Sequence, residues 1–442
     1  MKPTFAILVV ISGVFLAAAQ ESESFGPSAA VQNTPPATLD GQDIRRVPLS
    51  DIVTPNYISG GISIAQMYTD NAELTSTGKI SDLSYDIAPN LELNHFTPRV
   101  SYDLGISAGF LVNRTLSGQN HCTQSAGFDT SYGLSRFVTL RLSDSFTNSS
   151  GLWSSTNSGT AAEAGPGIGT VQQPNNALFT YGRFMTNTVL GELTAQLDAN
   201  SFVGARGTQS YLSYPSETTD SASRTLYGGN SYTAELFYNH QFTARNWGGI
   251  TARAERFDIN ASIGRTDTAS VLFFYAFTFR PSTSISVFSG PELSVTAVPQ
   301  GIPNPIGPFD HRMWVPAGGA VFNTQGRRFS ASASFTHQVN NGGGLFSAVT
   351  LDSASAEILG QFGKRLRLGP GFTYSESSPI VTSPTVRTYS GRFQLMYEIR
   401  SSSLVAGYGR DDWAAPSGNL PNASANRFWV GFSYSILRPL GR

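Results

Sequence analysis

Cysteine is almost absent from this 442-residue sequence, since Cys122 is its single cysteine. One cysteine excludes an internal disulfide framework, so internal cross-links do not stabilise the fold. Charged residues are also scarce, at 13%, against the roughly 25% usual in soluble domains. The net charge of -1 provides neither a basic surface nor an acidic tail, and no nucleic-acid partner is expected.

Long apolar runs are missing beyond the first stretch of the chain. No later run approaches the ~20 apolar residues that a membrane helix needs. If the chain crosses a membrane, it must therefore do so as a closed barrel. The first stretch has one lysine, Lys2, then an apolar run from Phe5 to Leu16 and small residues at 17–19. This pattern predicts a signal peptide, residues 1–19, cleaved after Ala19. The alternative, a short membrane anchor, is disfavoured because the run is too short to span a membrane comfortably.

Histidine is rare as well, with five in the chain. No two histidines have the i, i+4 spacing of a zinc helix. His121 is adjacent to Cys122 and Asp310 to His311, but neighbouring side chains of an extended chain point to opposite sides. The same holds for residues 411 and 412. We therefore expect that the chain has no catalytic, metal-binding or cofactor-binding residues and is not an enzyme.

Glycine and aromatic residues are abundant, with 44 glycines and 12% aromatic residues. From Tyr57 onward, stretches of about ten to fifteen residues alternate apolar and polar side chains, which is the period of a strand with two unlike faces. In the last stretch the apolar face holds Phe428, Val430, Phe432, Tyr434 and Ile436. One face suits lipid and the other water.

The links between these stretches alternate between short and long. Short links are expected near 95–98, 133–136, 197–200, 243–246, 280–283, 323–327, 363–364 and 400–403. Longer links are expected near 70–79, 113–124, 148–185, 215–228, 260–265, 297–310, 339–349, 377–385 and 413–423. This rhythm is typical of outer-membrane barrels, which have short periplasmic turns and long extracellular loops.

The predicted fold is all-β: a transmembrane antiparallel up-and-down barrel of about 16–18 strands, with 18 favoured. Residues 57–442 form the barrel, and the proline-rich segment 20–56 is a flexible periplasmic lead-in. The alternatives are that the lead-in folds into the lumen as a plug, and that the chain is a secreted adhesin or soluble β-sandwich array. The strands of a sandwich also alternate apolar and polar side chains, but the links between them need not alternate between short and long.

These features together resemble the bacterial outer-membrane β-barrel superfamily, above all the aromatic final strand Arg427 to Ile436. The run from Asp82 to Phe110 and the closing residues Arg438 to Arg442 resemble uncharacterised porin-like barrels of acidobacterial type. One feature departs from the superfamily. Many of its members end on an aromatic residue that the insertion machinery recognises, whereas this chain continues beyond Tyr434.

Charges on the polar face are the candidate functional residues, because a charge facing lipid costs ~2–4 kcal/mol near the midplane and one facing water does not. The candidate pore-lining residues are Asp103, Arg141, Glu192, Arg206, Glu235, Arg253, Glu255, Glu357, Arg367, Arg392 and Glu398. They could tune the ion preference of a channel. Alternatively, they pair across strands and brace the wall.

The predicted function is a porin-like outer-membrane channel for passive diffusion of small hydrophilic solutes, with weak charge selectivity because the two signs nearly balance. The expected partners are outer-membrane lipid, the barrel-insertion machinery and small solutes, and a homo-oligomer is possible. The alternative is a barrel that serves a secretion or envelope-assembly partner, such as one for surface polysaccharide.

Overall fold

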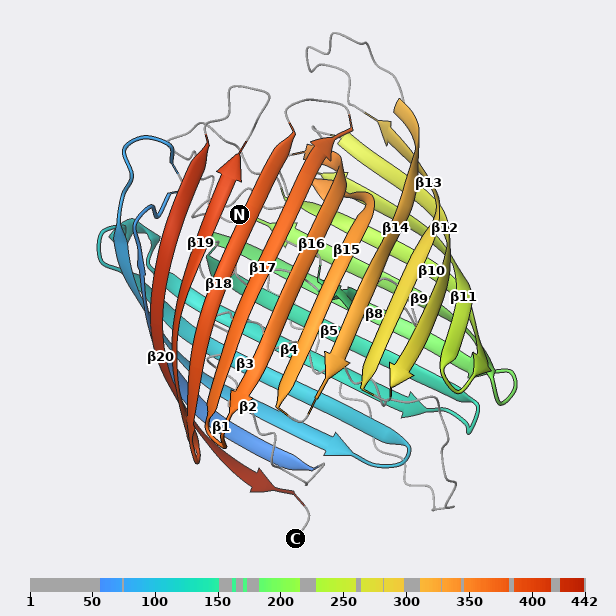
Figure 1. The fold of residues 1–442 in the computed structure, drawn as a ribbon, viewed down its shortest axis with the longest axis horizontal. Coiled ribbons are helices and arrows are strands. Elements are labelled where there is room, and N and C mark those ends of the chain that lie inside the picture. The colour runs from blue at the N-terminus through green and yellow to red at the C-terminus, as the bar shows by residue number, and fades with distance from the viewer. Residues whose placement is uncertain are drawn as a thin grey trace, which may run out of the picture. The chain divides into compact units, whose positions relative to one another are not determined.

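The computed structural model (Figure 1) describes most of the chain beyond residue 55. The chain divides into two units, Met1–Gln32 and Asn33–Arg442, and all described residues belong to the second. The predicted signal peptide and lead-in lie outside the described residues, apart from Asn56. The described residues are 56–73, 75–150, 161–163, 170–172, 183–214, 228–259, 264–280, 282–297, 311–326, 328–342, 346–380, 385–414 and 422–440.

Nearly all of the described secondary structure is strand, with one short 3₁₀ helix, η3 (Ser117–Gln119). None of the helical structure in these ranges is long and apolar enough to span a membrane. The strands are β1 (Tyr57–Thr69), β2 (Asp82–Phe96), β3 (Val100–Asn113), β4 (His121–Gly133), β5 (Val138–Ser150), β6 (Ala161–Glu163), β7 (Thr170–Gln172), β8 (Arg183–Gln196), β9 (Ser201–Ser213), β10 (Gly229–Thr243), β11 (Asn246–Ile259), β12 (Gly264–Arg280), β13 (Thr283–Ala297), β14 (His311–Gln325), β15 (Phe329–Gly342), β16 (Phe346–Phe362), β17 (Leu366–Pro379), β18 (Val386–Ile399), β19 (Ser402–Ala414) and β20 (Ala423–Pro439).

An 18-stranded antiparallel sheet closes on itself as a barrel, as predicted. Within this sheet each strand pairs with the next one in sequence, and β5 pairs with β8 because β6 and β7 form a separate two-stranded sheet. β1 pairs with both β2 and β20 over its whole length. Hydrogen bonds across the closure add to this pairing. The Asn426 backbone N–H and side-chain amide donate to the Asp70 carboxylate over 2.7 and 2.6 Å. Closure leaves no free edge between the first and last strands, so their backbone groups are satisfied within the wall.

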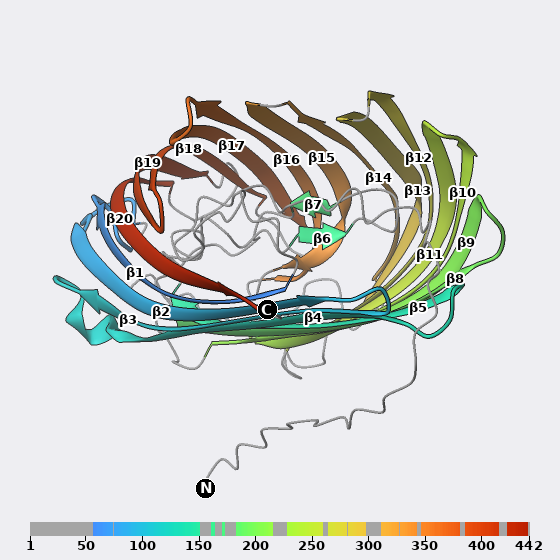
Figure 2. The same cartoon turned by 90° about the horizontal axis from the view of Figure 1, so that it is seen from below.

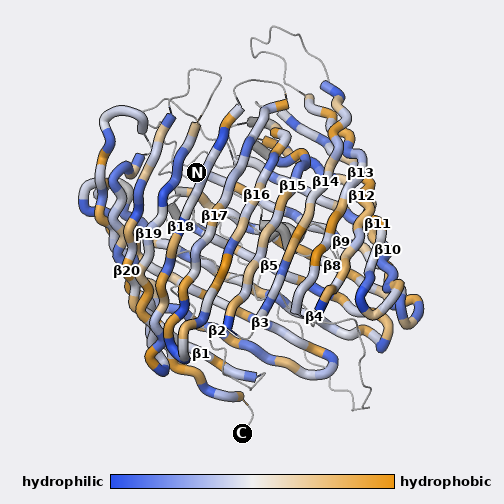
Figure 3. The backbone as a smooth tube through the Cα atoms, in the orientation of Figure 1, coloured by the Kyte–Doolittle hydropathy of each residue, from blue (hydrophilic) through white to orange (hydrophobic). Residues whose placement is uncertain are grey.

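Each strand has one face of exposed apolar side chains, which we call the outer face, and a less accessible inner face. Phe110 and Leu236 are each 65% exposed, whereas their inner-face neighbours Leu111 and Phe237 are each 2% exposed. The alternation along single strands is visible in Figure 3. A belt of exposed aliphatic and aromatic side chains around a closed wall suits contact with lipid.

The predicted short links are confirmed. They join β2–β3, β4–β5, β8–β9, β10–β11, β12–β13, β14–β15, β16–β17 and β18–β19 through two to four residues each. We call this the short-turn end of the barrel, and the opposite end the long-loop end. In the β8–β9 turn, the Asn200 backbone N–H donates to Asp198 over 2.7 Å, and this bond lowers the pKa of Asp198.

Two links predicted to be long are short. Only residues 260–263 separate β11 from β12, and only 343–345 separate β15 from β16. The strands extend further than the side-chain pattern indicated, because ladder pairing continues to the Ile259–Gly264 and Gly342–Phe346 pairs. At each of the other predicted long links, six or more residues separate consecutive strands of the barrel wall.

The ladder between β14 and β15 covers only part of the two strands. It runs from the Gln325–Ser330 pair to the Gly318–His337 pair and then stops. Beyond it β14 continues to pair with β13, and β15 with β16. The Val339 N–H, which has no partner on β14 there, donates instead to the Glu292 carboxylate over 2.9 Å. This bond meets the requirement that a buried backbone N–H be paired.

Beyond the Gly318–His337 pair, β14 lies against the faces of β15 and β16 instead of pairing edge to edge with β15. Val315 lies on the inner face of β14, opposite the 69% exposed Trp314. Val339 lies on the outer face of β15, in step with the exposed Phe335. Val315, Val339 and Ala348 nevertheless form one buried cluster. The inner face of β14 therefore packs on the outer face of β15 and β16 near the long-loop end.

Cysteines at Val315 and Val339 are expected to form a disulfide under mild oxidation, in a Cys122→Ser background. The expected readout is a mobility shift on a non-reducing gel. The control pair is Val315→Cys with Asn340→Cys, because a ladder continued from the Gly318–His337 pair would place residue 315 opposite residue 340. Cross-linking of the control pair in preference to the first would show a continuous ladder and contradict the overlap.

Candidate functional site

The sequence-predicted candidates all lie on the inner face of the barrel. Their sequence neighbours on the outer face include the exposed Leu142, Leu193, Leu236, Ile358 and Phe393. Strand pairing brings most of the candidates into contact, although they are spread over the chain from residue 103 to residue 398. The charges of the inner face therefore form local groups, and clusters of apolar side chains such as Leu272, Phe274 and Phe288 share the face with them.

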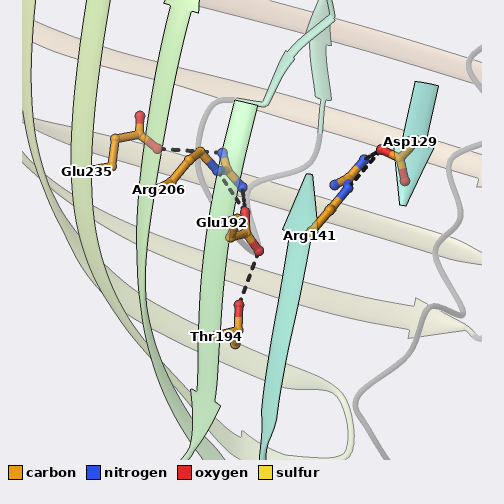
Figure 4. A network of polar contacts seen from close by, with 6 residues as sticks. All are labelled: Asp129, Arg141, Glu192, Thr194, Arg206 and Glu235. Carbon is orange, nitrogen blue, oxygen red and sulfur yellow. Dashed lines mark hydrogen bonds and ion pairs between the residues drawn. The ribbon is translucent and has the colours of Figure 1, made fainter. Parts of the chain in front are cut away.

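The largest cluster joins β8, β9, β10 and β11, and Figure 4 shows its members Glu192, Arg206 and Glu235. Arg206 contacts two carboxylates, Glu192 at 2.5 Å and Glu235 at 3.5 Å. These are its direct partners in the ladder on either side. Arg253 lies 3.5 Å from Glu235 and 2.5 Å from Glu255. The Arg206 and Glu235 side chains are each only 6% exposed. This cluster alternates in sign along the wall, so its charges largely cancel locally.

Arg141 of β5 pairs with a carboxylate that the sequence analysis did not select. Its Nε and Nη2 donate to Asp129 of β4 over 3.0 and 2.9 Å, and the two are drawn in Figure 4. Both side chains remain about two-fifths exposed, at 39% and 42%. Arg141 is also the ladder partner of Glu192. The pair therefore extends the polar surface of the β8–β11 cluster to β4.

A second group lies on β16, β17 and β18. Arg367 contacts Glu398 at 3.0 Å, and Arg392 lies 3.8 Å from Glu357. Gly371 of β17 separates the last two residues in the ladder. A Cβ at Gly371 would lie 2.8 Å from the Arg392 Nε. The glycine thus leaves the space in which Arg392 lies along the wall toward Glu357.

Asp103 stands apart from the arginines. Its carboxylate accepts a hydrogen bond from the Asn94 side-chain amide over 3.2 Å. Its ladder partner on β4 is another acid, Asp129. Of the eleven candidates, Asp103 is therefore the one that the structure places with amide and acid neighbours rather than in an arginine pair.

The sequence analysis missed several inner-face charges. They are Asp82, Asp86, Glu92, Asp129, Glu292, Asp411 and Arg427. The signal that identifies them is the phase of the alternation: Tyr85, Ile87 and Leu91 are exposed, so the even-numbered positions of β2 face inward. Arg427 pairs with Asp411 and is only 1% exposed, which makes it the largest fully buried side chain in the described ranges.

No group of three or more histidine, cysteine or acidic side chains suited to hold a metal occurs among the described residues. Asp411 and Asp412 are on opposite faces, where they pair with Arg427 and Arg410 respectively. Cys122 is exposed. Asp310 lies outside the described residues. The described inner face offers carboxylate, guanidinium and hydroxyl groups.

The link predicted at 148–185 contains two short strands. β6 and β7 pair with each other as a small hairpin. Figure 2 shows this hairpin within the ring of strands, and β7 comes within 8 Å of β15 between Cα atoms. The hairpin is therefore in a position to narrow the lumen.

Comparison with solved structures finds bacterial proteins of low sequence identity that match most of the chain. Pseudomonas aeruginosa OccK5 (OpdH) is 11% identical with a TM-score of 0.40, and the match covers 86% of this chain and 98% of that one. P. aeruginosa OccK2 (OpdF), in complex with glucuronate, is 10% identical with a TM-score of 0.44 over 86% and 98%. The P. aeruginosa outer membrane protein opdK is 8% identical with a TM-score of 0.41 over 86% and 99%. No protein-family model and no curated protein matches this sequence.

Proposed function

We propose that this protein is an outer-membrane channel through which small hydrophilic solutes diffuse passively. The observation that carries the proposal is the closed 18-stranded wall, apolar outside and charged inside. Eight strands suffice to enclose a space that side chains fill, whereas 16 to 18 strands leave an aqueous channel. An apolar outer belt has no role in water but matches the hydrocarbon layer.

Export and insertion complete the proposal. The signal peptide, residues 1–19, directs the chain out of the cytoplasm. The long loops face the outside and the short turns face the periplasm, as in other outer-membrane barrels. The eleven candidate residues line the pore, and Arg141 and Arg253 among them remain partly exposed.

Two segments are candidates to narrow the channel. The β6–β7 hairpin lies within the ring, and residues 20–56 precede the first strand. Either can occupy part of a lumen that the wall alone leaves open. The weak charge selectivity predicted from the sequence rests on the near balance of the eleven candidates, and it stays a prediction here.

Purified protein in planar lipid bilayers is expected to produce stable single-channel conductance steps. Replacing residues 151–182 with a short glycine–serine link should raise the conductance of each step, because it removes the hairpin from the lumen. Heat-modifiable mobility on a denaturing gel verifies that each preparation is folded. A folded barrel that never conducts, even without residues 20–56 and 151–182, would refute the channel and favour a role in secretion or envelope assembly.

A further inference from the structure

The inner face carries an excess of negative charge that the eleven candidates do not reveal. Over the strands that the structure describes, its carboxylates are Asp82, Asp86, Glu92, Asp103, Asp129, Glu192, Glu235, Glu255, Glu292, Glu357, Glu398 and Asp411. Its arginines are Arg141, Arg206, Arg253, Arg367, Arg392 and Arg427. Acids clearly outnumber arginines.

The two signs are also unevenly distributed around the wall. The arginines are confined to β5, β9, β11, β17, β18 and β20, and each contacts at least one carboxylate. β1, β2 and β3 place no lysine or arginine on their described inner face. The excess negative charge therefore concentrates on β2 and β3, as Asp82, Asp86, Glu92 and Asp103, which we call the acidic stripe.

The acidic stripe extends along most of the height of the wall. Asp82 lies at the long-loop end of β2, and Glu92 and Asp103 lie toward the short-turn end. At a rise of about 3.4 Å per residue, Asp82 and Asp86 are roughly 13 Å apart and Asp86 and Glu92 roughly 20 Å apart along the strand. These spacings are about 1.6 and 2.5 screening lengths at physiological salt, so each carboxylate of the stripe attracts cations locally, at successive heights of the wall.

Neutral donors hold the carboxylates of the stripe. The Tyr57 hydroxyl donates to Glu92 over 2.7 Å, and the Asn94 amide donates to Asp103. The Thr115 backbone N–H donates to Asp82 over 2.7 Å. A hydrogen bond from a neutral group adds no positive charge beside the carboxylate. An arginine partner would cancel the charge of the carboxylate, and the described ion pairs include none with Asp82, Glu92 or Asp103.

Two further features indicate that the stripe serves something other than the stability of the wall. Asp82 is 2% exposed, and its second carboxylate oxygen has no hydrogen-bond partner within the described residues. Asp103 faces Asp129 directly across the β3–β4 ladder, where like charges destabilise a sheet, and the Arg141 that pairs with Asp129 offsets only part of this repulsion. Both arrangements become favourable when a cation lies in front of them.

We infer that the channel is cation-selective and that the acidic stripe on β2 and β3 carries the selectivity. This inference rests on the proposed function and replaces the expectation of weak selectivity. The solutes favoured are inorganic cations and small organic cations such as amines, which the stripe attracts by charge. Anionic solutes meet a repulsive field along the same wall.

The test is the reversal potential of the purified channel in a bilayer that separates about 0.1 M from about 1 M KCl, concentrations at which the screening length falls from ~10 to ~3 Å. The wild-type protein is expected to favour K⁺ over Cl⁻ severalfold. The variant Glu92→Gln with Asp103→Asn should bring the permeability ratio toward one. Both substitutions keep an oxygen that accepts the Tyr57 and Asn94 hydrogen bonds.

The matched control is Arg367→Gln with Glu398→Gln, which removes one inner-face pair at 3.0 Å without changing the net charge. Its permeability ratio should equal that of the wild type. A second variant, Glu92→Lys, should lower the ratio further than Glu92→Gln does. A wild-type channel without cation preference overturns the inference, as does a cation preference that survives loss of Glu92 and Asp103. Absence of any current, even after residues 20–56 and 151–182 are removed, instead refutes the proposed function.

Discussion

Replacing Arg206 with methionine is expected to lower the free energy of unfolding by about 3 kcal/mol, because it removes the contacting cation of Glu192 and leaves Glu235 with Arg253 alone, at 3.5 Å. The guanidinium lies between Glu192 and Glu235, and its side chain is 6% exposed. Methionine keeps most of the volume, so the loss is electrostatic and does not come from a cavity. Equilibrium unfolding in urea, with the barrel folded into lipid vesicles, measures the change.

The control for this prediction is Arg256→Met on the same sheet. Arg256 pairs with Asp267 at 2.8 Å, but the two side chains are 48% and 40% exposed. An exposed pair contributes about 0–1 kcal/mol, so this variant should be near neutral. Adding Glu192→Gln and Glu235→Gln to Arg206→Met should recover much of the lost stability, since no buried charge then remains unpaired. Equal effects of Arg206→Met and Arg256→Met would contradict the burial of the first pair.

The barrel itself was predictable from the sequence because its signal is repeated in every strand. In β20 the exposed Phe428, Val430 and Ile436 alternate with the inward Arg427 and Trp429. A one-residue error in such a strand would place arginine in lipid, so the alternation also fixes the register. The link rhythm then gives the strand number, and the structure confirms 18.

Contacts between strands were less predictable, because alternation specifies a face and not a partner. It placed Arg392 and Glu357 inward but could not show that Gly371 leaves space between them. The partial β14–β15 ladder was equally hidden, since Val315 and Val339 are ordinary strand residues in sequence. Such contacts depend on how the closed wall bends, which a single strand does not encode.

The acidic stripe shows a different limit. Asp82, Asp86 and Glu92 are separated by even numbers of residues, so the alternation places them on one face of β2. Uncharged polar residues such as Asn90 and Asn94 lie on the same face, and the acids therefore do not stand out in the sequence. With the outer face of β2 identified by Tyr85, Ile87 and Leu91, their direction follows at once. The sequence alone does not show that Tyr85, Ile87 and Leu91 are exposed, and this exposure is what identifies the inner face of β2.

Among substitutions on the outer face, Leu236→Arg is expected to lower the folding stability most. Leu236 is 65% exposed and lies at the centre of β10, between the inner-face residues Glu235 and Phe237. If the outer belt contacts lipid, arginine there should cost about 2–4 kcal/mol of folding free energy, because the charge enters the hydrocarbon midplane. If the wall instead faced water, exchanging an exposed leucine for arginine would leave stability unchanged within about 0.5 kcal/mol.

The depth of the position provides the control. Phe242 is 60% exposed on the same strand, but it is next to the last residue at the short-turn end. Phe242→Arg should cost only about 0–1 kcal/mol, because a charge near the interface reaches water and lipid headgroups. Both variants are measured by reversible folding into vesicles of the same lipid. A difference of about 2 kcal/mol or more between the two variants places the centre of β10 in the hydrocarbon layer. Equal and small costs would contradict the membrane location of the barrel and therefore the proposed channel.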